Sequence, residues 1–162
     1  MDNNAVSHIL VNGFPRSGNN FLTSLFAQAF DENIIFIHHR VDYLSVPNCV
    51  VPIRKPEENI PSWARFSETD DIDGIIKWYE RFYAGILDNV NNVTIFAFDE
   101  FAANPLSMVD YLANKLHINK KEVDLSKAYK NANQTKYDIL DDERLDKCKA
   151  LFNQVYEKRA II

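Results

Sequence analysis

Short apolar runs alternate with longer amphipathic stretches along most of the chain. The apolar runs suit β-strands and lie at residues 8–12, 34–37, 49–53 and 93–98. Between and after them, apolar residues recur at helical spacing. This spacing predicts helices over residues 20–30, 57–66, 70–90, from 105 onward and over 141–158. Pro61 is expected to bend or restart the second of these helices.

Strands separated by helices predict an α/β fold, in which a central, mostly parallel sheet of about four to five strands has helices on both faces. The strands are apolar along their length, as expected for burial from both sides. No repeat or change in composition divides the sequence, so residues 1–162 are expected to form a single domain. The stretch 126–138 is polar and weakly periodic, and the sequence leaves open whether it is an ordered loop or a lid.

The composition excludes several function classes. A net charge of -5 and a pI near 5.3 argue against nucleic-acid binding, which needs a basic face. No apolar run approaches the ~20 residues needed to span a membrane. The first residues lack the basic region of a signal peptide, so a cytoplasmic protein is expected. Cys49 and Cys148 are too few for a disulfide framework and show no metal-ligand spacing.

The segment from Gly13 to Asn20 joins the first strand candidate to the first helix candidate. Its two glycines, separated by four residues, have the spacing of a phosphate-binding loop (P-loop). Backbone N–H groups in such a turn, together with the helix N-terminus, bind anions. The Lys-Ser/Thr pair of ATP- and GTP-binding loops is replaced by Asn19 and Asn20, and the cation lies inside the loop at Arg16. The alternative is a tight turn in which Arg16 is a solvated surface charge.

Residues Pro15 to Phe21 resemble the 5′-phosphosulfate loop of the sulfotransferase family. The second signature of that family is an arginine at the end of a strand and a serine eight positions later. It is matched by Arg54 and Ser62. A weaker match covers residues 96–105, and the resemblance as a whole extends over residues 8–118. The C-terminal part, 119–162, is expected to be helical.

The resemblance implies that the donor is 3′-phosphoadenosine 5′-phosphosulfate and that no metal is needed. Arg54 and Ser62 would bind its 3′-phosphate. Arg16 would contact the phosphosulfate and assist catalysis. The remaining expected donor-binding residues are Ser17, Gly18, Asn19, Asn20 and Phe21, the last in the place of a tryptophan that stacks on adenine.

The resemblance also implies a general base after the second strand, where the sequence has His38 and His39. His39 falls on the family position, and an imidazole suits proton abstraction at neutral pH. Neighbouring strand residues face opposite sides, so only one of the two histidines is expected at the site. The alternative is that both are surface residues. The acceptor would be a hydroxyl or amine on a small molecule or glycan, and the sequence does not identify it.

Several features depart from the family pattern. Ile37 stands where the family has a lysine, Asn20 replaces a threonine, and Phe98 replaces a tyrosine. The C-terminal loop that covers the 3′-phosphate in the cytosolic enzymes is absent. A simpler lid could be formed by the stretch that carries Lys127, Lys130 and Lys136, or these lysines are solvated charges.

The aromatic residues Trp63, Trp78, Tyr79 and Phe82 either line an acceptor pocket or belong to the core. Two other functions stay open at this point. One is a P-loop kinase of a small metabolite, and the other is a non-catalytic module that binds adenosine bisphosphate.

Overall fold

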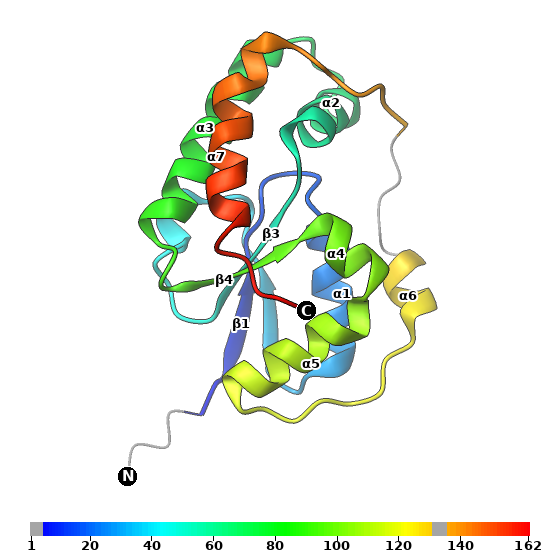
Figure 1. The fold of residues 1–162 in the computed structure, drawn as a ribbon. Helices are drawn as coiled ribbons and strands as arrows, with labels where there is room; N and C mark the ends of the chain where they lie inside the picture. Colours follow the sequence, from blue (N-terminus) through cyan, green and yellow to red (C-terminus); the bar gives the residue numbers. More distant parts are fainter. Residues whose placement is uncertain (1–4, 131–135) are drawn as a thin grey trace.

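Four parallel strands form the centre of the computed structural model, which describes residues 5–130 and 136–162 (Figure 1). The strands lie in the order β2-β1-β3-β4, and every pairing is parallel. Their carboxyl ends therefore meet at one edge of the sheet. The strands are β1 (His8–Val11), β2 (Asn33–Phe36), β3 (Cys49–Ile53) and β4 (Val93–Ala97).

Helices cover both faces of this sheet, which confirms the predicted three-layer α/β/α architecture. One face is covered by α2 (Pro56–Phe66), α3 (Ile72–Asp88) and α7 (Asp146–Tyr156), which Figure 1 shows beside one another. The other face is covered by α1 (Asn19–Ala29), α4 (Phe98–Ala103), α5 (Pro105–Leu116) and α6 (Leu125–Lys130). Short 3₁₀ turns lie at Val41–Tyr43 and Glu143–Leu145.

Strand alternation divides the core between the two faces. Val51 of β3 packs among the side chains of α2, α3 and α7, whereas Val50 packs on the α1 side. All five residues of β3 are buried, as the continuous apolar run at 49–53 predicts. The apolar stripe of α1 is buried as expected, from Phe21 to Ala29.

Pro61 was expected to bend or restart this helix; it lies inside α2, which continues through it without a restart. Proline has no N–H group to donate to the carbonyl of Glu57 four residues earlier. That carbonyl instead accepts a hydrogen bond from the backbone N–H of Leu140, at 3.0 Å. The missing helical bond thus attaches the chain near residue 140 to the first turn of α2.

Two elements differ from the sequence prediction. Phe98 begins α4 instead of ending β4. Residues 125–130, which overlap the polar stretch 126–138, form α6, and the buried Ala128 packs this helix on the α1 side of the sheet. Residues 131–135, on which part of the predicted lid falls, lie outside the described residues.

Both cysteines are buried. Cys49 lies in β3 and Cys148 in α7, and each thiol is reduced. Burial raises the pKa of both thiols to about 12. Among the described residues, no helix is long and apolar enough to cross a membrane.

The N-terminus of α3 is stabilised by a side-chain cap whose contribution to folding can be measured. The side chain of Asp71 accepts a hydrogen bond from the backbone N–H of Gly74 at 3.1 Å, which makes Asp71 the N-cap. We expect Asp71→Ala to lower the free energy of unfolding by about 1 kcal/mol in urea titration. Asp70→Ala, at the adjacent exposed position, is the matched control. Equal stability of the two variants would contradict the capping role.

Candidate functional site

The loop between β1 and α1 leaves the sheet in very close contact with β3. A Cβ atom on Gly13 would lie 2.5 Å from Cγ and 2.8 Å from the carbonyl oxygen of Pro52, so only glycine fits. Arg16 (φ 66°) and Gly18 (φ 99°) are in the left-handed region, which is rare for arginine. Backbone strain of this kind concentrates at functional sites.

Asn19 shapes this loop from within. Its Oδ1 accepts from the N–H of Gly13 at 2.7 Å, and its Nδ2 donates to the carbonyls of Gly13 and Phe14 at 3.1 Å. The side chain is buried, so it stabilises the turn. The position at which nucleotide-triphosphate loops carry lysine is therefore occupied here by a structural amide.

Asn59 of α2 binds the same loop from the other side. Its Nδ2 donates to the carbonyl of Pro15 at 2.5 Å, and its Oδ1 accepts from Oγ of Ser17 at 3.1 Å. Asn59 and Ser17 are both fully buried. The hydroxyl of Ser17, expected to face a ligand, is thus engaged inside the protein.

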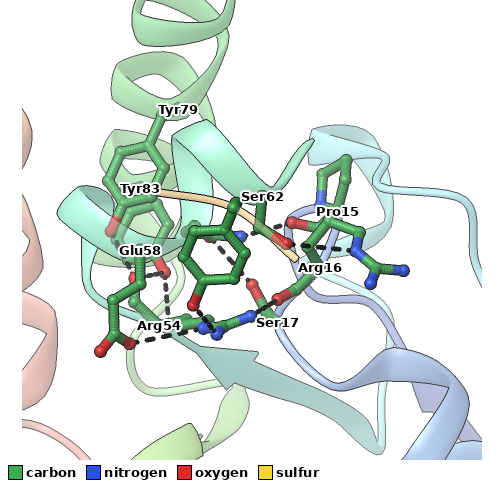
Figure 2. A network of polar contacts seen from close by, with 10 residues as sticks. Pro15, Arg16, Ser17, Arg54, Glu58, Ser62, Tyr79 and Tyr83 are labelled. Atoms are coloured by element: carbon green, nitrogen blue, oxygen red, sulfur yellow. Dashed lines mark hydrogen bonds and ion pairs between the residues drawn. The ribbon is translucent and has the colours of Figure 1, made fainter. Parts of the chain in front are cut away.

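Two tyrosines of α3 hold the backbone of Arg54, immediately after β3 (Figure 2). The hydroxyl of Tyr79 donates to the Arg54 carbonyl at 2.8 Å, and the N–H of Arg54 donates to the hydroxyl of Tyr83 at 3.0 Å. Both rings are fully buried and stack at 3.9 Å between centroids. Burial raises the pKa of both phenols, so they stay neutral hydrogen-bonding groups.

The side chain of Arg54 extends from this clamp to the loop. Its Nη1 donates to the carbonyl of Arg16 at 2.9 Å, its Nη2 to the hydroxyl of Tyr137 at 2.5 Å, and its Nε contacts Glu58 at 3.5 Å. The guanidinium also lies 4.2 Å from the ring centroid of Phe98. These contacts fix its position and direction (Figure 2).

Arg16 provides a second cation close to the first. Its Nε donates to Oγ of Ser62 at 3.4 Å, and its guanidinium carbon lies 4.6 Å from the Phe66 ring centroid. Burial, followed by the positive charge of Arg54, lowers the pKa of Arg16. Two neighbouring guanidinium groups repel each other, and a bound anion would relieve this repulsion.

His39 follows the end of β2 in a left-handed conformation (φ 60°). Its Nδ1 lies 2.6 Å from the carbonyl oxygen of Gly13. Since a carbonyl only accepts, Nδ1 carries the proton and the basic lone pair is on Nε2. Burial is the main cause that lowers the pKa of His39, which keeps the ring neutral at neutral pH.

The expected alternation between His38 and His39 is wrong, because β2 already ends at Phe36. Both histidines line the same cavity. The two histidines differ in that His39 is partly buried with its Nδ1 held by Gly13, whereas His38 is exposed.

Both arginines, both histidines and Ser62 line one cavity, whose volume is about 650 Å³. Its lining in the described residues contains two arginines, two histidines and many aromatic rings, and no aspartate or glutamate. It brings together the predicted residues Arg16, Gly18, Asn19, Asn20, Phe21, His38, His39, Arg54 and Ser62, and leaves out Ser17. In a chain with a net charge of -5, this cavity is locally cationic and has apolar walls, which would suit an anion.

The aromatic candidates separate into two groups. Trp63 lines the cavity, whereas Trp78, Tyr79 and Phe82 pack in or against the core on the α3 side. Lys127, Lys130 and Lys136 are exposed and do not line the cavity. Among the described residues, no group of three or more histidine, cysteine, aspartate or glutamate side chains has a metal-binding arrangement.

Three contributions to the site were missed from the sequence: Asn59, the Tyr79–Tyr83 pair and Tyr137. Asn59 had a usable signal, because it is a polar residue adjacent to Ile60 on the buried side of a helix. Tyr79 looked like an ordinary core aromatic. Tyr137 lies in a weakly periodic stretch that gave no signal.

The chain matches no protein-family model, and it has no significant match among the curated proteins.

The depressed pKa of His39 predicts a pH dependence of stability. As the pH falls through about 6.5, the unfolded chain binds a proton at this residue that the native state still resists. The free energy of unfolding should therefore decrease as the medium is acidified from pH 7.5 to 5.5.

His39→Asn should weaken this decrease, because asparagine tolerates the left-handed conformation and can still donate to Gly13. Urea titrations at each pH measure the effect, and His117→Asn, at another left-handed position, is the matched comparison. A pH dependence of His39→Asn identical to that of wild type would contradict the assignment.

Proposed function

We propose that this protein is a sulfotransferase that transfers a sulfuryl group from 3′-phosphoadenosine 5′-phosphosulfate to a hydroxyl acceptor. The observation that carries the proposal is the pairing of Arg16 and Arg54 at one cavity whose described lining has no acidic residue. Two fixed cations suit a donor that carries phosphate groups at both the 5′ and 3′ positions of its ribose. The resemblance of the loop and of the Arg54–Ser62 spacing to the sulfotransferase signatures supports the same conclusion.

The 5′-phosphosulfate would bind at the loop before α1. Backbone N–H groups and the positive end of the helix dipole favour an anion there, and Arg16 adds a full charge. Asn20 is exposed and lines the cavity, so its amide is available to a phosphate oxygen. Phe21 lies beside Tyr129 and Phe101 in an aromatic wall suited to adenine.

The 3′-phosphate would bind at Arg54 and Ser62. Arginine can donate to two phosphate oxygens at once, and charge-assisted bonds of this kind are strong. Ser62 accepts its bond from Arg16, so its hydroxyl hydrogen can still be donated to a phosphate. This second phosphate distinguishes the proposed donor from ATP.

In the proposed reaction, Nε2 of His39 removes the proton of the acceptor hydroxyl. The acceptor oxygen forms a bond to sulfur while the bond between sulfur and the phosphate oxygen breaks, which leaves adenosine 3′,5′-bisphosphate. Arg16 stabilises the charge that develops on the leaving phosphate. Because the sulfuryl group carries little negative charge, positioning and these cations supply the main catalytic effects.

The donor assignment predicts a ligand preference. Adenosine 3′,5′-bisphosphate should raise the melting temperature more than ATP with Mg²⁺ does, because ATP has no 3′-phosphate. Arg54→Ala should weaken bisphosphate binding by ~1.5–3 kcal/mol in isothermal titration. Arg65→Ala, at the exposed end of α2 and outside the cavity, is the control.

Stronger stabilisation by ATP would point instead to a P-loop kinase. Bisphosphate binding without turnover on any acceptor would indicate a non-catalytic binding module.

The role of His39 predicts a loss of turnover without a loss of donor binding. With His39→Asn, release of adenosine 3′,5′-bisphosphate from the donor should slow by about 10²–10⁴-fold across a panel of phenols and sugars. Titration should show an unchanged affinity for the bisphosphate. His8→Asn, outside the cavity, controls for the replacement of a histidine. Full activity of His39→Asn would remove this residue from the mechanism.

A further inference from the structure

Residues 136–140 are attached to the rim of the site by the main chain. The N–H of Leu140 donates to the Glu57 carbonyl that Pro61 leaves without its helical partner. The Leu140 side chain also packs against the core cluster between the sheet and α3. Tyr137 is therefore held near Arg54 by contacts that do not depend on its own hydroxyl.

The phenol of Tyr137 lies directly beside the guanidinium of Arg54. Its oxygen accepts from Nη2 at 2.5 Å, its ring centroid is 5.4 Å from the guanidinium carbon, and the residue lines the cavity. Arginine can only donate, so the phenol acts as the acceptor in this pair. Its own hydrogen can then be donated to a further acceptor.

We propose that Tyr137 is a specificity-determining residue that donates a hydrogen bond to the anion held by Arg54. This inference rests on the proposed function, in which that anion is the 3′-phosphate of the donor. A phosphate oxygen bound to Nη2 of Arg54 would also lie within reach of the Tyr137 hydroxyl, because that hydroxyl is adjacent to Nη2. Tyr137, from the C-terminal part of the chain, would thus donate an uncharged hydrogen bond to the same phosphate that Arg54 binds by its positive charge.

The polarity of the contacts around Arg54 supports this role. The guanidinium has five N–H donors, and three have partners within the described residues: the Arg16 carbonyl, Glu58 and Tyr137. The first two partners only accept and would repel a phosphate. Tyr137 is the one of the three that can also donate, because its hydroxyl keeps its own hydrogen while it accepts from Arg54.

The test measures how much the 3′-phosphate contributes to affinity. In the intact chain, this contribution is the dissociation constant for adenosine 5′-phosphate divided by that for adenosine 3′,5′-bisphosphate. We expect Tyr137→Phe to weaken bisphosphate binding about tenfold, as for one hydrogen bond to a charged group. Binding of adenosine 5′-phosphate should stay unchanged, so the ratio falls. Tyr111→Phe, on α5 and outside the cavity, is the matched control and should leave the ratio at its wild-type value.

The possible failures are distinguishable. A wild-type protein that binds the two nucleotides equally well would refute the proposed function itself. A wild-type preference for the bisphosphate that survives in full in Tyr137→Phe would overturn this inference alone. Tighter bisphosphate binding by Tyr137→Phe would also overturn it, because the phenol would then compete with the phosphate for Arg54.

Discussion

The hydrogen bonds between the β1–α1 loop and residues 54–59, which lead from β3 into α2, are the interaction on which the whole site depends. Asn59 binds the Pro15 carbonyl and Arg54 binds the Arg16 carbonyl, so both carbonyl groups are held by protein donors. A loop whose acceptors are satisfied in this way can present its N–H groups to an anion without competition from nearby oxygens. The same bonds join the two cationic positions into one rigid unit.

Burial of the groups around the cavity has two consequences, and both suit anion chemistry. Aromatic walls lower the local polarity, which strengthens any attraction between the arginines and a bound anion. The same burial disfavours a proton on His39, so its Nε2 stays unprotonated. A neutral base and permanent cations thus coexist in one cavity, because guanidinium groups keep their charge under conditions in which imidazole loses it.

Local pattern predicted most of the elements and the loop that carries Arg16, the resemblance to the sulfotransferase signatures predicted Arg54 and Ser62, and long-range contacts supplied the remainder. The strand at 49–53 and the buried stripe of α1 follow from apolar spacing, and Arg16, Arg54 and Ser62 were expected at one site and do line one cavity. The bounds of α6 escaped prediction because the stretch 126–138 is polar and weakly periodic. The Asn59–Pro15 and Arg54–Tyr137 bonds join residues 44 and 83 positions apart, which no periodicity encodes.

The reactivity of the two cysteines reports on the packing of only one face of the sheet. Cys49 and Cys148 both belong to the core between the sheet and α2, α3 and α7, and the opposite core contains neither of them. Because the thiols are buried and un-ionised, an alkylating reagent reaches them only when that side opens. Thiol labelling would therefore follow the opening of the core beneath α3 and α7, and it would not report fraying of α1 or α5.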